Sequence, residues 1–324
     1  MLRQVGSLFW NGDEGRLRAG IRVCVYFGFW GFGPALLHLL LGEVVRSGAG
    51  DSARWAASIY LDLLRLLAVL IGTWIVARFV DQRPVAAYGL RITWQWGRDW
   101  LFGAVLGAGL MAAIFGVEWL AGWVVVTDRW VSPPGVALVA ALAAPLMLAL
   151  VVAIAEELLA RGNMLLNLTE GFRFLGRRAA VLVAWGLSSA IFGVLHYFNP
   201  NSSWLSTLYL MLYGILLGTG YVLTGQLAIP IGLHFTWNFV QGSVFGFPVS
   251  GRALSDAALM TTEAVGPVLW TGGAFGPEAG LLGILAALAG IGLIYLWVRW
   301  TAGDAGFDRL YANTWQPANE RKGT

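Results

Sequence analysis

The sequence predicts an all-α membrane protein, a polytopic bundle of about eight transmembrane helices with both termini in the cytoplasm. Composition is the first reason: 58% of the residues are hydrophobic and only 12% are charged, whereas a soluble domain has about 25% charged residues. The mean hydropathy is +0.69. The second reason is that the apolar residues fall into runs of about 20, the length that crosses the hydrocarbon core of a bilayer.

The predicted spans follow one another along the chain with mostly short polar connections. Two connections are longer, at residues 79–98 and 248–278. The second of them is rich in Gly, Pro, Ser and Thr, and we expect it to be a mobile loop. The predicted spans are 21–41, 57–78, 100–126, 138–168, 179–197, 204–224, 227–247 and 279–300.

The basic residues predict the orientation of the bundle. When the connections are assigned to alternate sides, 16 Lys and Arg residues fall on the side of the two termini, with the span residues Arg22, Arg78, Arg161 and Arg299 included. The other side has only four, namely Arg46, Arg54, Arg129 and Arg252. Because cytoplasmic loops carry the excess of Lys and Arg, both termini are predicted to be cytoplasmic.

The domain organisation is predicted to be simple, since the sequence has no internal repeat. One membrane domain is expected, in which residues 1–137 form spans 1–3 and their lead-in, residues 138–247 form the core, and residues 248–324 form a loop, the last span and a tail. The net charge of +3 is small and does not indicate a nucleic-acid partner. The expected partner is the lipid bilayer, in the plasma (inner) membrane of a prokaryote.

A few ionisable residues interrupt the predicted spans, and each is costly there. Asp62 and Arg65 lie three residues apart on the second span, where one helix face can hold both as a neutral pair. Glu118 stands alone near the end of the third span, and we expect its side chain to reach the membrane interface.

The fourth span carries three charges in "VVAIAEELLARGN". Glu157 and Arg161 have the spacing of four residues that lets them pair along a helix. Glu156 points about 100° away from Glu157 around the helix and has no local partner. Glu156 is therefore the residue whose place in the membrane requires an explanation.

Two later spans carry two of the three histidines of the chain. Phe192 and His196 lie four residues apart at the end of the fifth span, and His234 and Asn238 have the same spacing on the seventh. A buried Glu is a suitable general base, a His can hold a water, and Asn and His donors can stabilise an oxyanion. The set predicts hydrolysis of an amide; the alternative is a polar network that only holds helices together.

The three motifs together resemble a known family. E-E-x-x-x-R, F-x-x-x-H and H-x-x-x-N occur in this order on membrane helices in the CPBP family of intramembrane metalloproteases, which includes type II CAAX prenyl proteases, bacteriocin-processing and Abi-like members. The resemblance covers about residues 138–247. The motif residues here are Glu156, Glu157, Arg161, Phe192, His196, His234 and Asn238.

The resemblance implies a catalytic role for each motif residue. Glu156 would activate the attacking water, His196 would hold that water, and His234 with Asn238 would stabilise the oxyanion. Glu157 and Arg161 would support the site through their pairing. Zinc or another divalent metal could be bound by Glu156, His196 and His234, and a metal-free glutamate mechanism would use the same residues.

We therefore expect an intramembrane endopeptidase that cleaves a peptide or protein substrate at the membrane, prenylated or of bacteriocin type. Two other functions are compatible with the sequence. A proton-coupled transporter could use the Glu and His residues as a relay, although the inverted repeats typical of transporters are absent from the sequence. A catalytically silent immunity or binding protein could have the same scaffold.

Overall fold

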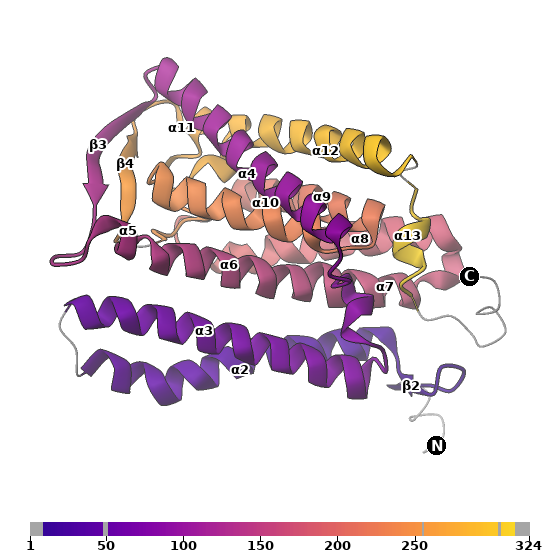
Figure 1. Cartoon of the computed structure of the whole chain (residues 1–324). Coiled ribbons are helices and arrows are strands. Elements are labelled where there is room, and N and C mark those ends of the chain that lie inside the picture. Colours follow the sequence, from indigo (N-terminus) through magenta and orange to yellow (C-terminus); the bar gives the residue numbers. More distant parts are fainter. Residues whose placement is uncertain (1–8, 48–50, 255, 304–305, 315–324) are drawn as a thin grey trace.

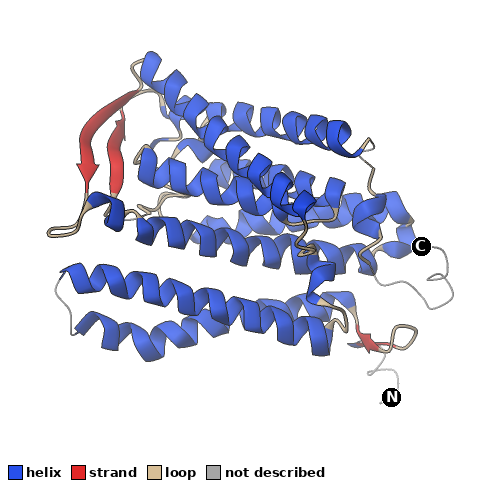
Figure 2. Ribbon diagram, in the orientation of Figure 1, coloured by secondary structure: helices blue, strands red, loops and turns tan. Residues whose placement is uncertain are grey.

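The structure, a computed structural model, describes residues 9–47, 51–254, 256–303 and 306–314. It is a bundle of long helices with two very small sheets (Figures 1 and 2). In Figure 1, β2, α7 and α13 lie at one end of the bundle, while β3, β4 and α11 lie at the other. The polar site described below is positioned by the helices between these ends.

A helix occupies the position of every predicted span. The long helices are α2 (Ala19–Ser47), α3 (Asp51–Ile75), α4 (Trp94–Leu120), α6 (Ala143–Glu157), α8 (Arg177–Leu195), α9 (Trp204–Thr224), α10 (Ala228–Phe239) and α12 (Leu281–Ala302). Six helical stretches among the described residues are long and apolar enough to cross a membrane, and these agree with spans two to six and span eight. The stretches are Ala56–Val80, Trp94–Leu120, Leu138–Gly171, Arg177–Phe198, Trp204–Thr224 and Leu281–Ala302.

The seventh predicted span is the shortest of the long helices. α10 continues into a π-helical segment, η6 (Val240–Val244), and the polypeptide then leaves the helix. Nine of the 12 residues of α10 are buried inside the bundle. This helix is surrounded by protein, so its length is not set by contact with lipid.

Two predictions about the chain between helices are wrong. The third span was expected to run to residue 126, but α4 ends at Leu120 and strand β3 (Val124–Val131) begins after a turn at Gly122 with φ 70°. The expected mobile loop 248–278 contains β4 (Ala258–Ala264), which pairs antiparallel with β3. The β-branched run at 124–127 has high strand propensity, so its apolar character was mistaken for the end of a helix.

The second small sheet lies near the start of the described chain. It joins β1 (Trp10–Asn11) to β2 (Arg16–Leu17) in antiparallel register. Both sheets have two strands, so the prediction of an all-α fold holds for the bundle but not for these ribbons. The remaining short elements are α5 (Leu138–Ala141), α7 (Leu166–Gly171), α11 (Val268–Thr271), α13 (Asp308–Tyr311) and the single turns between helices.

Glycine allows α4 and α10 to approach closely. A Cβ atom added to Gly103 would lie 2.3 Å from the Ile229 carbonyl oxygen, and one added to Gly107 would lie 2.4 Å from that of Leu233. Small residues at such crossings are typical of membrane helices, because apolar tails give little other drive for association. The crossing fixes α10, which carries His234 and Asn238, against the bundle.

The outward faces of the helices are apolar, as contact with a bilayer requires. Leu39, Leu120 and Val139 are each at least 75% exposed. The Asp62 and Arg65 side chains form the expected pair at 2.8 Å, with Asp62 buried and Arg65 35% exposed. The prediction for Glu118 is wrong: its side chain is fully buried and neither carboxylate oxygen has a hydrogen-bond partner among the described residues.

Candidate active site

The helix that carries the paired glutamates changes geometry directly after them. The helical stretch Leu138–Gly171 consists of α5, α6, the π-helical segment η3 (Leu158–Leu165) and α7. Glu157 is the last residue of α6, and Arg161 lies in the π-helical segment. π-Helical turns are frequent at functional sites, because they change the direction in which neighbouring side chains point.

Glu157 is fully buried between two cationic or ionisable partners. Its Oε1 atom lies 2.9 Å from Arg161 Nη1, the pair predicted from the spacing, and also 2.9 Å from His234 Nδ1. The Arg161 guanidinium also donates to the Gly214 carbonyl at 3.0 Å and lies 4.6 Å from the centre of the Phe192 ring. Glu157 thus joins the fourth helix to α10, and Arg161 joins it to α8 and α9.

Glu156 faces the other way, as predicted, and meets both motif histidines. Its Oε2 atom lies 3.9 Å from His196 Nε2 and 4.0 Å from His234 Nε2. Its side chain is 22% exposed, in contrast to the fully buried Glu157. The two imidazoles therefore face one carboxylate oxygen, with a separation that leaves room for a small molecule between them.

Hydrogen bonds fix the roles of the ring nitrogens. His196 Nδ1 lies 2.8 Å from the Phe192 carbonyl oxygen, which only accepts, and His234 Nδ1 faces the Glu157 carboxylate in the same way. Each Nδ1 atom must therefore carry the proton in the neutral ring. Both Nε2 atoms then present lone pairs toward Glu156.

Asn238 completes the set from one turn farther along α10. It is 7% exposed and lines the same cavity as Glu156, His196 and His234. Its amide has no hydrogen-bond partner among the residues that the structure describes, so its N–H groups are available to a bound substrate. The structure thus brings Glu156, His196, His234 and Asn238 to one cavity and places Glu157 and Arg161 behind it.

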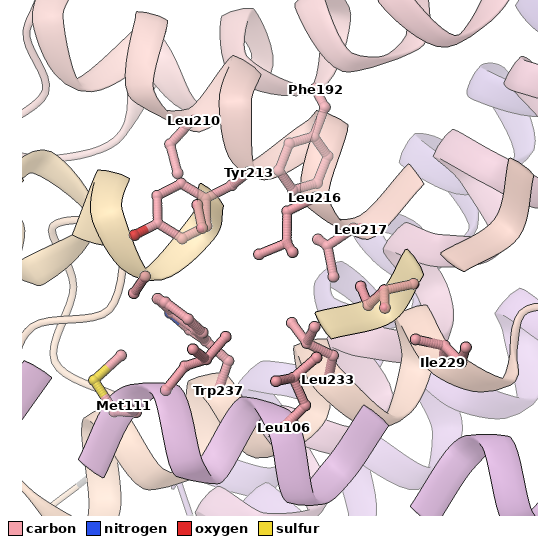
Figure 3. Close-up of a cluster of buried hydrophobic side chains, with 14 of the residues drawn as sticks. Leu106, Met111, Phe192, Leu210, Tyr213, Leu216, Leu217, Ile229, Leu233 and Trp237 are labelled. Carbon is pink, nitrogen blue, oxygen red and sulfur yellow. The ribbon is translucent and has the colours of Figure 1, made fainter. Parts of the chain in front are cut away.

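The cavity has a volume of about 550 Å³ and is mostly apolar. Figure 3 shows the buried hydrophobic cluster that contributes to its wall, in which Tyr213 and Trp237 lie near each other. The labelled side chains that line the cavity are Phe192, Leu210, Tyr213, Leu217, Leu233 and Trp237. The Tyr213 and Trp237 rings meet edge to face with centroids 5.1 Å apart. An apolar cavity with a few convergent polar groups is the usual form of a binding site.

Sequence reasoning missed the residues that close one end of the cavity. Ser250, Arg252 and Glu278 line it, although all three lie in the segment expected to be a mobile loop. Ser250 (φ 46°) and Gly251 (φ 82°) form a tight turn between Val249 and Arg252, which pair as a single antiparallel bridge. A Ser-Gly dipeptide is a recognisable turn signal, but nothing in the sequence placed that turn beside the motif helices.

Glu278 anchors this turn from a buried position. Its Oε2 atom accepts from the Ser250 backbone N–H at 2.7 Å and from Gln241 Nε2 at 2.9 Å, and its Oε1 accepts from the Ser250 hydroxyl at 3.1 Å. Burial raises the pKa of Glu278 to about 7, although the bonds from Gln241 and Ser250 act in the opposite direction. A lone Glu before the last span gave no sequence signal for this role.

The side chains of Glu156, His196 and His234 have the right donor atoms for a metal, but the atoms are too far apart to bind one. Two imidazole lone pairs and a carboxylate are zinc ligands, and each Nδ1–H already has the acceptor that metal-bound histidines usually have. However, two ligands of one tetrahedral zinc lie about 3.3 Å apart, whereas the distances to Glu156 are 3.9 and 4.0 Å. Among the described residues, no group of three His, Cys, Asp or Glu side chains is placed to hold a metal ion.

Fold and site together define a class: a helical membrane protein with a carboxylate and two histidines around an internal cavity. Residues 138–240 match a family model described as Type II CAAX prenyl endopeptidase Rce1-like. The match includes all six predicted site residues and confirms the family resemblance predicted from the three motifs. It supports a hydrolase and does not favour the transporter or the silent binding protein. No curated protein and no solved structure matches the chain.

Proposed function

We propose that this protein is an intramembrane endopeptidase in which Glu156 activates a water for attack on a peptide carbonyl. The observation that carries the proposal is the arrangement of His196 Nε2 and His234 Nε2 at about 4 Å from the same Glu156 oxygen. The family match supports a protease in general terms.

The water would lie between the carboxylate and the two imidazoles. It can donate one hydrogen bond to Glu156 and one to a histidine Nε2, which leaves an oxygen lone pair for the attack. As the bond to the carbonyl carbon forms, Glu156 takes the proton. Because its side chain faces the cavity and is partly exposed, Glu156 can later pass that proton to the leaving amine.

Asn238 and His234 would stabilise the oxyanion. The Asn238 amide can donate without any change of protonation. His234 can donate from Nε2 only in the imidazolium form, for which it takes a second proton from solvent before the water attacks; its Nδ1–H still faces Glu157 in that form. Preorganised donors of this kind account for about 3–4 kcal/mol of transition-state stabilisation where one has been removed from other hydrolases.

The substrate would be a membrane-associated peptide or protein with apolar residues near the scissile bond. The cavity is lined by Leu, Val, Phe and Trp side chains, and the outer faces of the helices around it are apolar. A prenylated segment or a bacteriocin-type peptide has this character.

No step of the proposed reaction passes through a metal ion, because the carboxylate and histidines suffice to hold and deprotonate the water.

The test is cleavage of a membrane-tethered peptide library by the purified protein in lipid nanodiscs, with products identified by mass spectrometry. Glu156→Gln is expected to lower kcat by at least about 100-fold, the low end of general-base contributions. Glu118→Gln is the matched control, since it makes the same change at a buried Glu that does not line the cavity. Equal cleavage by wild type and Glu156→Gln would refute the proposal.

A further inference from the structure

A second cluster of buried charges lies at the end of the bundle that holds β2 and α7, far along the fourth helix from Glu156. Arg16 and Arg22 are each 1% exposed, and Glu170 is 3% exposed. The cluster contains more arginine than acid. Its arginines are Arg16, Arg22, Arg83 and Arg173, and its acids are Glu14, Asp81 and Glu170.

The Glu170 carboxylate forms ion pairs with three guanidinium groups. Its Oε2 atom lies 2.9 Å from Arg16 Nη2 and from Arg22 Nη2, and Arg83 Nη2 lies 2.9 Å from both of its oxygens. One negative charge therefore faces three positive charges in a place that water hardly reaches. Like charges so close together in a buried site are unfavourable unless further anions balance them.

The other two acids do not supply that balance. Glu14 pairs with Arg16 at 2.7 Å and with Arg173 at 2.9 Å. Asp81 is fully buried and accepts from the Tyr88 hydroxyl and the Asn167 amide, with Arg83 Nε 3.7 Å away. Among the described residues, four arginines (Arg16, Arg22, Arg83 and Arg173) against three carboxylates leave an excess of one positive charge. Burial lowers the pKa of Arg16, and the nearby Arg22 and Arg83 lower it further, while Glu170 opposes the shift.

A cavity adjoins this excess charge. It has a volume of about 340 Å³ and is lined by Arg18, Arg22 and Arg173 together with Glu14 and Glu170. Arg22 contacts its acidic partners, Glu14 and Glu170, only through Nη2. Its Nε and Nη1 atoms are buried and have no hydrogen-bond partner among the described residues. Unpaired guanidinium donors in a buried site are rare, because leaving such a donor unsatisfied costs free energy.

We propose that this cavity is a binding site for a phosphate group, held by Arg22 and Arg173 with Arg18 at its rim. A phosphate carries between one and two negative charges and several acceptor oxygens, which match the excess positive charge and the guanidinium groups that line the cavity. Basic pockets between membrane helices can bind phosphate-bearing lipid headgroups. The phosphate can come from an anionic lipid or from a free phosphate ester, and this site is independent of the proposed peptidase chemistry.

The experiment uses delipidated full-length protein in a neutral detergent at constant ionic strength. Thermal unfolding is followed with inorganic phosphate, with glycerol 3-phosphate and with sodium chloride as the ionic control. In a second arm, the protein is exposed to vesicles of phosphatidylglycerol or of phosphatidylcholine, re-extracted, and examined for retained lipid by native mass spectrometry. A ligand that binds only the folded state raises its melting temperature.

Three variants make the test specific. Arg22→Gln and Arg173→Gln are expected to weaken binding at least about 10-fold, the second with less risk to folding since Arg173 is 32% exposed. Arg177→Gln is the control, because Arg177 lies close by in the sequence and pairs with the exposed Asp308 outside the cavity. It should bind as wild type does.

The outcomes separate the two sources of phosphate. Stabilisation by both soluble phosphates that is lost in Arg22→Gln and Arg173→Gln supports a site for a free phosphate ester. Retention of phosphatidylglycerol alone, lost in the same two variants, supports a lipid headgroup site. The proposal is overturned if neither probe binds wild type beyond the chloride control, or if Arg177→Gln reduces binding as much as Arg173→Gln does.

Discussion

His234 Nδ1 and Arg161 Nη1 bind the same carboxylate oxygen of Glu157, each at 2.9 Å. Residues separated by 77 positions in the sequence are thereby fixed to one another at the centre of the bundle. The arrangement explains why the two adjacent glutamates are not interchangeable. Glu157 is buried and orients a histidine, whereas Glu156 faces the cavity and the Nε2 atom of that same histidine.

Glu157→Gln is expected to destabilise the protein by about 3–5 kcal/mol, because it leaves Arg161 buried without an anion. It should also lower kcat with little change in KM, since Glu157 acts on the reaction through the orientation of His234. Glu157→Asp keeps the charge and should restore part of both losses. Unfolding in denaturant and cleavage kinetics on the folded fraction would measure the two effects.

Asp308→Asn provides the comparison for that prediction. It breaks the Arg177–Asp308 ion pair, whose side chains are 58% and 73% exposed, and exposed pairs contribute about 0–1 kcal/mol. If Glu157→Gln lowers the free energy of unfolding no more than Asp308→Asn does, the buried Glu157–Arg161 pair does not stabilise the fold as inferred.

Chelation tests the role of metal in the reaction. Prolonged treatment with a strong chelator is expected to leave peptide cleavage unchanged, because Glu156 and the two histidines are spaced to hold a water between them. Activity of treated and untreated protein is compared, and metal content is measured by mass spectrometry. Loss of activity that zinc restores would instead assign Glu156, His196 and His234 as metal ligands.

The buried Glu278 predicts a dependence of stability on pH. Its pKa rises from 4.5 to about 7 on folding, so the folded state favours the protonated form. The stability contributed by protonation is complete below about pH 4.5 and is lost as the pH rises to about 7. The difference corresponds to about 3 kcal/mol at most.

Glu278→Gln should remove that dependence, and the comparison of wild type with the variant isolates it from other titrating groups. Melting temperatures measured from pH 4.5 to 8 should diverge, with wild type losing stability relative to the variant over this interval. A constant difference between the two curves would show that Glu278 has the same pKa in the folded and unfolded states.

Glu118→Gln is expected to raise the melting temperature or leave it unchanged. Glu118 is fully buried, and neither of its oxygens has a hydrogen-bond partner among the described residues. Burying an unpaired carboxylate is unfavourable, and a neutral amide of nearly the same shape reduces that cost. A clear fall in melting temperature would reveal a partner that requires the carboxylate.

Local spacing was sufficient to predict several contacts. The pair Glu157–Arg161, the pair Asp62–Arg65 and the opposite orientation of Glu156 all follow from helix periodicity. The positions of the helices follow from the lengths of the apolar runs. The strand β3 could not be separated from the end of α4 in this way, because a short run of valines is equally apolar in a helix and in a strand.

The sequence by itself determined that this protein is a helical membrane protein. It also determined which residues form the three motifs that resemble a protease family. The tertiary structure decided which motif atoms meet: it placed His234 between Glu156 and Glu157, and it brought Glu278 and the turn at Ser250 to the same cavity. The arginine cluster around Glu170 likewise unites residues of β2, α2 and α7. Periodicity reports contacts within a helix, whereas these contacts depend on how helices cross, and the crossings are set by close backbone approaches such as Gly103 against Ile229.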